Sequence, residues 1–359
     1  MSDQPSQPPK SSNVAWGILG TGVIAHRFAN GLAKSRTGEL FAVGSRTQDS
    51  ADAFAKEFNV GRSYGSYEAL LADPAVQAVY ISTPHSSHAQ WCIEAARARK
   101  HILCEKPLTL NHPEAMVVVN AVREHGVFLM EAFMYRCHPQ MARLVELIRS
   151  DAIGQVGVIQ ATFSFHASYD PGSRLFKNAL GGGGILDVGC YTMSVARLIA
   201  GAALGLPFAN PSRITGYARL HPETRADLYA VASTEFPGGV LAQLATGVGL
   251  NQDNGVRVFG SEGSLHLPTP YIAAREGGSV TMFLTRNGNS TPEEIVIETK
   301  DYLYALEADS VGDALAQGKL ESPHMTLADT LGNMAALDEW RASAGVVYDS
   351  EKPGRDGKL

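Results

Sequence analysis

The chain has 359 residues, long enough for two domains that each bury a core. Its composition, with 45% hydrophobic residues, 18% charged residues and a net charge of -6, is that of an ordinary globular protein and argues against a general nucleic-acid binder, which would carry a basic face. The four cysteines form no Cys-x-x-Cys pair, so we expect reduced thiols in a cytoplasmic protein, without a disulfide scaffold or a metal site.

The N-terminal segment, residues 1–12, is predicted to be a disordered leader. Its sequence, MSDQPSQPPKSS, lacks the apolar stretch of a signal peptide. We also expect no apolar window long enough to span a bilayer, and therefore no membrane association.

Residues 13–135 are predicted to form a dinucleotide-binding domain of the α/β class. Apolar runs typical of strands alternate here with amphipathic stretches typical of helices, which indicates a doubly wound, Rossmann-type parallel sheet. The predicted strands are 14–20, 39–45, 77–82, 101–104 and 127–132.

The first predicted strand runs into a Gly-x-Gly-x-x-Ala turn, Gly20 to Ala25, that opens a helix. Glycines permit a tight turn and let backbone N–H groups approach a pyrophosphate, and the helix N-terminus favours the negative charge. The second strand ends at Ser45 and Arg46, without the acid that usually holds the ribose 2′-hydroxyl of NAD. We therefore expect NADP as the favoured cofactor and leave NAD open.

The third and fourth predicted strands end in Ser82-Thr83-Pro84-His85 and in Glu105-Lys106-Pro107. The carboxyl edge of an open α/β sheet is where ligands bind, so Lys106 is a catalytic candidate, whereas the second Glu-Lys-Pro, at 351–353, lies in a polar tail. Whether the Lys106–Pro107 bond is cis is left open. His85 and His88 are three apart, and turn or cap roles are favoured over a metal pair. The expected cofactor contacts are Gly20, Thr21, Gly22, Val23, Ile24, Ser45, Arg46, Thr83, Pro84, His88, Glu105 and Lys106.

Residues 136–359 are predicted to form a substrate-binding and dimerisation domain of the α+β type with a large, open, mostly antiparallel sheet. Successive strand patterns without intervening helices indicate antiparallel pairing. The predicted strands are 156–165, 212–220, 228–236 and 239–248, and the predicted helices are 141–151, 185–201, 302–317 and 326–344.

A run of four glycines, 181–184, leads into the helix that carries Asp187 and Tyr191. These two residues are four apart and share a helix face, and the glycines are expected to allow close approach to a flat ring. Asp187 and Tyr191 are therefore candidate catalytic and substrate-binding residues. Arg174, Phe176 and Phe165 are candidate walls of the substrate pocket, although a surface arginine and core aromatics explain them equally well.

The ordered series of motifs resembles the Gfo/Idh/MocA family, which includes glucose–fructose oxidoreductase and inositol dehydrogenase. Many members carry histidine where Tyr191 stands; tyrosine there, with MEAFMYRCHP at 130–139, looks most like the branch of dimeric dihydrodiol dehydrogenases and NADP-dependent xylose dehydrogenases. The resemblance extends over nearly the whole chain and rests on 20–25, 83–88, 105–107, 130–136, 182–191, 260–264, 321–331 and 337–341.

The resemblance implies hydride transfer between nicotinamide and a secondary alcohol or carbonyl of a sugar, cyclitol or trans-dihydrodiol. Tyrosine needs a nearby cation to titrate near neutrality, so Lys106 is expected to lower the pKa of Tyr191, and the reverse assignment of acid and base stays open. The alternatives are an NAD-dependent cyclitol dehydrogenase and a non-catalytic dinucleotide-sensing regulator. The resemblance further implies a homodimer through the open sheet.

Overall fold

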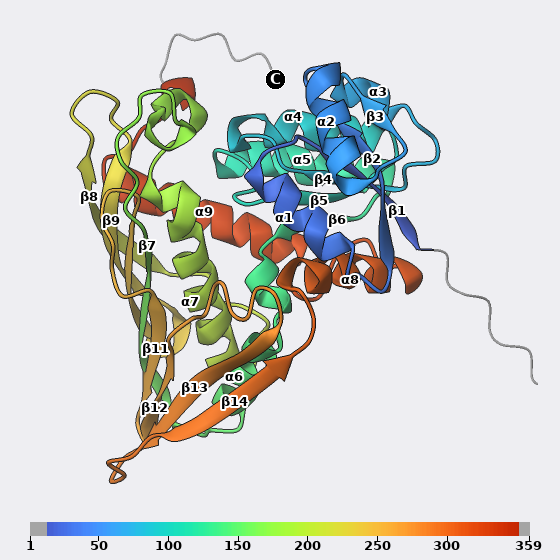
Figure 1. Ribbon diagram of the computed structural model, residues 1–359. Helices are drawn as coiled ribbons and strands as arrows, with labels where there is room; N and C mark the ends of the chain where they lie inside the picture. Colours follow the sequence, from blue (N-terminus) through green and yellow to red (C-terminus); the bar gives the residue numbers. More distant parts are fainter. Residues whose placement is uncertain (1–12, 352–359) are drawn as a thin grey trace, which may run out of the picture.

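The structure is a computed structural model that describes residues 13–351. The predicted leader and Lys352 lie outside the described residues. Two sheets dominate the molecule, one at the upper right and one along the left in Figure 1, with helices between them.

The first sheet is the predicted parallel Rossmann sheet, with strand order β3-β2-β1-β4-β5-β6. Its central strands are buried on both faces, which explains why their sequences are continuously apolar rather than alternating. The strands are β1 (Val14–Leu19), β2 (Gly38–Gly44), β3 (Ser63–Tyr64), β4 (Ala78–Ile81), β5 (His101–Glu105) and β6 (Leu129–Ala132). The connecting helices are α1 (Val23–Leu32), α2 (Gln48–Phe58), α3 (Tyr67–Leu71), α4 (His88–Arg97) and α5 (His112–His125).

The second sheet has eight strands in the order β14-β13-β12-β11-β7-β10-β9-β8. Only β7 and β10 pair in parallel, so the prediction of a mostly antiparallel sheet is confirmed. The last four strands, β11 to β14, were not predicted from the sequence. The strands are β7 (Val156–Ser164), β8 (Arg213–Leu220), β9 (Asp227–Glu235), β10 (Leu241–Gly247), β11 (Gly255–Gly260), β12 (Gly263–Leu267), β13 (Gly278–Arg286) and β14 (Glu293–Thr299).

Helices cover one face of the second sheet and leave the other face open (Figure 1). The covering helices are α6 (Pro139–Arg149), α7 (Cys190–Ala203) and α9 (Leu327–Ser343). The helical segment Ile185–Ala203 is long and apolar enough to cross a bilayer, so the expectation that no such window exists was wrong. Its window is wholly buried inside the protein, as in the core helix of a globular domain.

Helix α8 (Leu303–Ala316) returns from the second sheet to pack against α1 (Figure 1). A Cβ on Gly31 would lie 2.4 Å from the Cβ of Tyr304, so glycine is required for this close approach. The Asp309 carboxylate accepts N–H bonds from Arg36 and Thr37, which ties α8 to the turn before β2. The first sheet is thus supported by sequence that follows the second.

Candidate active site

A hollow of about 1310 Å³ lies at the carboxyl edge of the parallel sheet. Every residue that the sequence predicted to contact the cofactor lines it, including Gly20 in the glycine turn and Lys106 after β5. The lining also includes Ser50, Ser66, Tyr67 and Trp91, which sequence reasoning missed because they belong to no motif. Tyr67 and Trp91 meet edge to face at 4.8 Å and form part of its wall.

The glycine turn fits a pyrophosphate. Gly20 has φ +104°, and a Cβ there would lie 2.9 Å from the Oγ of Ser82, so the tight turn requires glycine. A Cβ on Gly22 would meet no protein atom within 4 Å, so the missing side chain leaves open space on the side that faces the hollow. No side chain caps the start of α1, so its first N–H groups are free to bind an anion.

The end of β2 forms the next part of the hollow. Ser45 is buried and its hydroxyl lies 3.4 Å from that of Thr21, whereas Arg46 is exposed. Thr47 caps α2 by accepting the N–H of Ser50. The end of β2 therefore brings Ser45, Arg46 and the start of α2 together in this part of the hollow.

His88 connects the two loops that follow β4 and β5. Its Nδ1 lies 2.9 Å from the carbonyl oxygen of Pro107, and its Nε2 lies 2.8 Å from that of Thr83. Burial lowers the pKa of His88 to about 4, so the ring is neutral at physiological pH and can donate to only one of these two carbonyl oxygens. The Lys106–Pro107 peptide bond in the second loop is cis.

Lys106, Asp187 and Arg174 meet at the inner end of the hollow. The Lys106 ammonium donates to the backbone carbonyl of Asp187 at 2.7 Å and lies 3.9 Å from its carboxylate. Arg174 donates to the same carboxylate at 2.8 Å. Arg174 makes the shorter contact, but Lys106 is the less exposed cation (14% against 43%), so solvent screens its charge less.

Burial and these two cations act on Asp187 in opposite directions. Burial alone would raise the pKa of Asp187, but the charges of Lys106 and Arg174 outweigh it, so the pKa is lowered and the carboxylate stays ionised. His85 lies nearby, and its Nε2 donates to the carbonyl oxygen of Gly181, 3.1 Å away. Burial, followed by the charge of Arg174, lowers the pKa of His85 to about 3, so it is neutral.

Tyr191 lies behind Lys106, with the ammonium 5.1 Å from the centre of its ring. Its hydroxyl donates to the sulfur of Met134 at 3.3 Å, and only 4% of the residue is exposed. Burial, then the charge of Glu105, raises the pKa of Tyr191 well above its ordinary value. The expectation that Lys106 lowers this pKa was therefore wrong for this geometry, because the ammonium faces the ring and not the phenol oxygen.

The glycine loop serves protein packing, not approach to a flat ring. A Cβ on Gly182 would lie 2.6 Å from the carbonyl oxygen of Arg174, one on Gly183 would lie 1.9 Å from the Asp227 carboxylate, and one on Gly184 would lie 2.8 Å from the Cα of Gly247. These clashes explain the run of glycines without any ligand.

The two predicted aromatic wall residues lie apart from the lining. Phe176 is buried against Tyr169 and His221, with ring centres 5.3 and 6.3 Å away. The backbone N–H of Phe165 donates to the carbonyl of Gly247. The aromatic rings that surround Tyr191 are instead Phe133, Tyr135, Phe163 and Tyr271.

The second Glu-Lys-Pro begins with a residue that is held in place. Glu351 accepts two hydrogen bonds of 2.9 Å from Arg341. Next to it, the N–H of Asp349 donates to the Asn178 side chain, which in turn donates to the carbonyl of Val347. Residues 347–351 therefore anchor the loop that carries Arg174.

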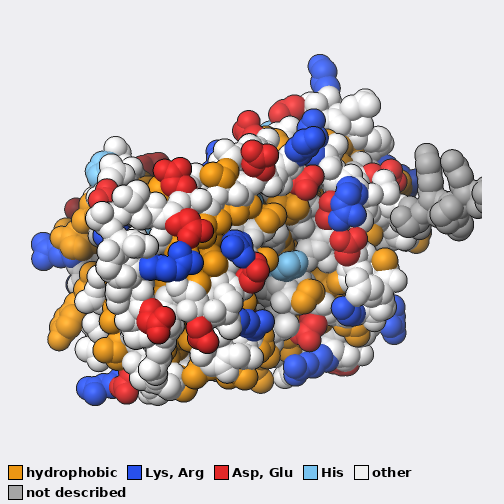
Figure 2. All heavy atoms as spheres, turned by 90° about the horizontal axis from the view of Figure 1, so that it is seen from below, with side chains coloured by type: hydrophobic (Ala, Val, Ile, Leu, Met, Phe, Trp, Pro, Cys, Tyr) orange, Lys and Arg blue, Asp and Glu red, His pale blue; other side chains and the backbone are white. Residues whose placement is uncertain are grey.

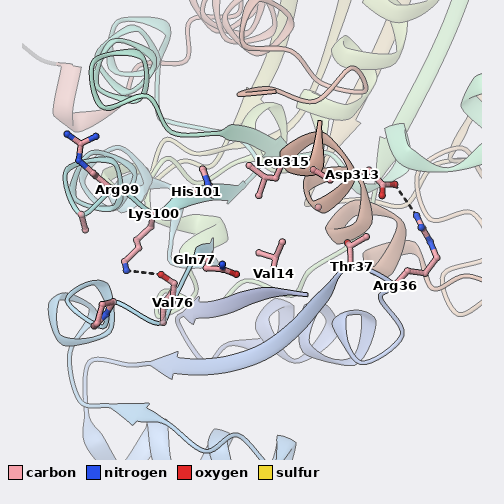
Figure 3. Close-up of a pocket in the computed structure, with 14 residues that line it drawn as sticks. Val14, Arg36, Thr37, Val76, Gln77, Arg99, Lys100, His101, Asp313 and Leu315 are labelled. Atoms are coloured by element: carbon pink, nitrogen blue, oxygen red, sulfur yellow. Dashed lines mark hydrogen bonds and ion pairs between the residues drawn. The ribbon is translucent and has the colours of Figure 1, made fainter. Parts of the chain in front are cut away.

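A second hollow, of about 750 Å³, lies at the opposite edge of the parallel sheet (Figure 3). Lys100 donates there to the carbonyls of Asp73 and Val76, and Arg36 pairs with Asp309 and Asp313. These cations are already neutralised or hydrogen-bonded by the protein. Among residues 13–351 there is also no group of three or more His, Cys, Asp or Glu side chains that could hold a metal ion.

Charged groups of both signs are scattered over the face shown in Figure 2, without a stripe of one sign.

The candidate site is the hollow at the carboxyl edge. Lys106 and Arg174 belong to its lining, whereas Asp187, which contacts both, and Tyr191 lie behind the lining.

Comparisons with known proteins agree with this description. Residues 14–133 match the model of an oxidoreductase family with an NAD-binding Rossmann fold, and residues 141–266 match the Gfo/Idh/MocA C-terminal domain. The chain is 32% identical over 345 residues to trans-1,2-dihydrobenzene-1,2-diol dehydrogenase of Mus musculus, covering 94% of this chain and 98% of the other. It is 30% identical over 341 residues to the NADP-dependent D-xylose 1-dehydrogenase 2 of Haloferax volcanii, again covering 94% and 98%.

Among solved structures, the chain is similar to a 3-ketoreductase from Actinomadura kijaniata in complex with NADP and TDP-benzene. The TM-score is 0.83 at 27% identity, with 93% of this chain and 98% of the other covered. Structures of the same ketoreductase with a lysine or a tyrosine replaced are also similar.

Proposed function

The chain belongs to the Gfo/Idh/MocA family of NAD(P)-binding oxidoreductases, and from this membership we propose that it is an NADP-preferring dehydrogenase or reductase acting on a secondary alcohol or carbonyl of a sugar, cyclitol or trans-dihydrodiol. The observation that carries the proposal is the continuity of the hollow, which runs from the uncapped start of α1 to Lys106. A dinucleotide along it would bring its reactive ring to the Lys106 end.

The cofactor would be held by groups along this hollow. The first N–H groups of α1 would bind the pyrophosphate, Ser45 and Arg46 would bind the ribose phosphate, and Thr83 and Pro84 would border the nicotinamide. When bound, the nicotinamide supplies or accepts the hydride. The NADP in the related ketoreductase supports this choice of cofactor.

The acid–base work falls to the cluster at the inner end. In the reducing direction, the Lys106 ammonium would stabilise negative charge on the substrate oxygen. Tyr191 stays protonated because its pKa is raised, so it would serve as a proton donor rather than as a base. Asp187 stays ionised and would accept a hydrogen bond from a second substrate hydroxyl, after exchanging its contact with Arg174.

The first experiment is absorbance of the reduced nicotinamide with NADP⁺ or NAD⁺ and a panel of D-xylose, D-glucose, myo-inositol and a cyclic trans-diol. We expect turnover of one class with NADP⁺ and a loss of about 10²- to 10⁴-fold in the Tyr191→Phe variant. Turnover with NAD⁺ and myo-inositol would favour a cyclitol dehydrogenase. Tight NADPH binding without turnover in either direction would favour a dinucleotide-sensing regulator.

Arg46 tests the cofactor preference separately. Arg46→Ala removes the charge that would face the 2′-phosphate, so the Kd for NADPH is expected to rise by about 10-fold or more while the Kd for NADH is unchanged. Equal effects on both cofactors would contradict an NADP preference set at this position.

The open face of the second sheet supports a homodimer. Its outward side chains include exposed apolar residues on three neighbouring strands, and no described helix covers them: Tyr217, Tyr229, Val231 and Leu241. We also propose the cytoplasm as location, since all four cysteines are free thiols.

A further inference from the structure

Asp227 is a buried acid at the first position of β9 that the proposed chemistry does not use. It is 0% exposed, and its Oδ2 accepts the N–H of Ile185 at 2.7 Å. It also forms an isolated bridge with Gly183, where φ is +124° and a Cβ would lie 1.9 Å from the carboxylate. The carboxylate therefore contacts the glycine loop and the first helical residue after it.

This helical segment has no other side-chain cap at its start. A π-turn, Ile185–Gly189, precedes α7, and neither element has a side-chain hydrogen bond at its cap position. The first N–H groups of a helix have no partner within the helix, and a carboxylate there satisfies them and complements the helix dipole. Asp227 supplies that group from a neighbouring strand, and Thr246 on β10 adds a bond to the carbonyl of Gly184 at 3.0 Å.

The same segment carries the residues of the candidate site. Asp187 lies in the π-turn and Tyr191 lies in the first turn of α7. The carbonyl that accepts the Lys106 ammonium also belongs to the π-turn, because it is that of Asp187. A shift of this turn would therefore move the acceptor of Lys106, the carboxylate and the phenol together.

We propose that Asp227 is a positioning residue for the reaction. It holds the first turn of this segment against the second sheet and so keeps Asp187 and Tyr191 in place beside Lys106. The inference rests on the proposed function of the same site. It explains why the loop contains a glycine that no other residue could replace at position 183.

The charge of Asp227 is sensitive to pH near neutrality. Burial raises the pKa of Asp227 to about 7, against the N–H groups of Ile185 and Gly184, which lower it. The charged and titratable groups that act on it are Arg341 of α9 and Tyr348 after α9. Below about pH 7 the carboxyl gains a proton and the helix start loses its anionic partner, so kcat is expected to fall on the acid side.

Asp227→Asn tests the proposal, with Asp309→Asn as the matched control. Asp309 is also a buried carboxylate that accepts backbone N–H groups, but it lies at the opposite edge of the first sheet. We expect Asp227→Asn to lower kcat by about 10- to 100-fold, since small displacements at a reacting centre cost this much, and to leave the Kd for NADPH within about twofold. The acid limb of kcat near pH 7 should disappear in this variant and remain in the control.

Hydrogen exchange of the full chain gives a readout that does not need a substrate. Peptides from 183–195 should exchange faster in Asp227→Asn and at the wild-type rate in Asp309→Asn. Wild-type kcat and pH profile in Asp227→Asn, or an equal loss in both variants, would overturn the proposal. If the wild-type chain turns over no substrate, the proposed function fails. The anchoring role of Asp227 is then judged by hydrogen exchange alone: faster exchange of peptides 183–195 in Asp227→Asn would support it, and unchanged exchange would overturn it.

Discussion

At the scale of single residues, the site depends on one carboxylate that two cations share. Asp187 accepts from Arg174 and lies beside Lys106, so in the proposed function a substrate hydroxyl would have to compete with a charged hydrogen bond to reach it. Charge-assisted hydrogen bonds are among the stronger ones in proteins, so breaking the bond between Arg174 and Asp187 would weaken substrate binding. Because Arg174 is 43% exposed, its side chain has room to move away.

Lys106→Met removes the ammonium and keeps a side chain of similar length. We expect kcat to fall by about 10²- to 10⁴-fold, because the developing charge on the substrate oxygen loses its partner, while the Kd for NADPH changes little. Steady-state kinetics and fluorescence titration measure the two quantities. Lys100→Met is the control, since Lys100 is held by two carbonyls at the far edge. A Lys106→Met variant with more than a tenth of the wild-type kcat would contradict the assigned role.

Gly183→Ala should be far more harmful than Gly205→Ala. Both glycines have positive φ, +124° and +71°, but a Cβ on Gly183 would overlap the Asp227 carboxylate, whereas one on Gly205 would meet nothing within 4 Å. We expect a loss of about 3 kcal/mol or more in the free energy of unfolding for Gly183→Ala and about 1 kcal/mol for Gly205→Ala. Urea denaturation compares them, and equal losses would show that backbone strain alone decides.

The sequence predicted Lys106 as a site residue, but it did not predict the role of the glycine loop or of Asp227. Lys106 stood out because the end of a parallel strand is a place that the sequence pattern identifies. The role of the glycine loop was misread, since the atoms that exclude a Cβ come from Asp227 and Gly247, far along the chain. Asp227 itself belongs to no motif, and only the fold brings it to Gly183.

At the scale of elements, the helices between the sheets are joined by a buried ionic cluster. Asp329 on α9 accepts from Arg197 on α7 at 2.5 Å and from Arg136 at 2.7 Å. Both arginines are almost fully buried, so each needs this carboxylate to offset its loss of hydration. The cluster thus connects the helix that carries Tyr191 to the helix that spans the two sheets.

Asp329→Ala leaves two buried arginines without their shared anion. We expect a loss of about 3–5 kcal/mol in the free energy of unfolding, the range measured when one partner of a buried ion pair is removed. Chemical denaturation followed by circular dichroism measures it. Asp313→Ala is the control, because Asp313 is half exposed and its pair with Arg36 should contribute less than about 1 kcal/mol. A loss below about 1 kcal/mol for Asp329→Ala would contradict the role of the cluster.

Strands β11 to β14 carry weaker sequence signals than the other strands. The turn between β13 and β14, in 286–294, carries Gly, Asn and charged residues, and strands with one exposed face give weaker apolar signals than strands buried on both faces. The parallel strands, by contrast, were located to within a few residues because helices cover both of their faces. The two-residue strand β3 was too short to be recognised.

At the scale of the whole molecule, the fold leaves one face of the second sheet without a cover (Figure 1). Tyr217 and Val231 face each other across β8 and β9, and both point outward. Exposed apolar side chains in such a row are typical of an interface. A dimer through this face would leave both hollows of the pair accessible, because the carboxyl edge of the parallel sheet belongs to the other part of the molecule.

Val231→Lys should convert a dimer to a monomer. The mutation places a charge in the centre of the proposed contact, and burying an unpaired charge there is costly. Sedimentation velocity at micromolar concentration measures the change, with Val117→Lys on α5 as a control of similar exposure (44% against 49%). A wild-type chain that sediments as a monomer would refute the dimer.

The anchoring of Asn178 by residues 347–351 implies an order in time. During synthesis, the segments that form the nucleotide end of the hollow leave the ribosome first, whereas the clasp on the loop of Arg174 is made only after α9 has emerged. The first sheet is in turn packed against α8, which also follows the second sheet, so a nascent chain can complete neither half of the site before its last helices have emerged. Both halves of the site are therefore completed at the end of synthesis.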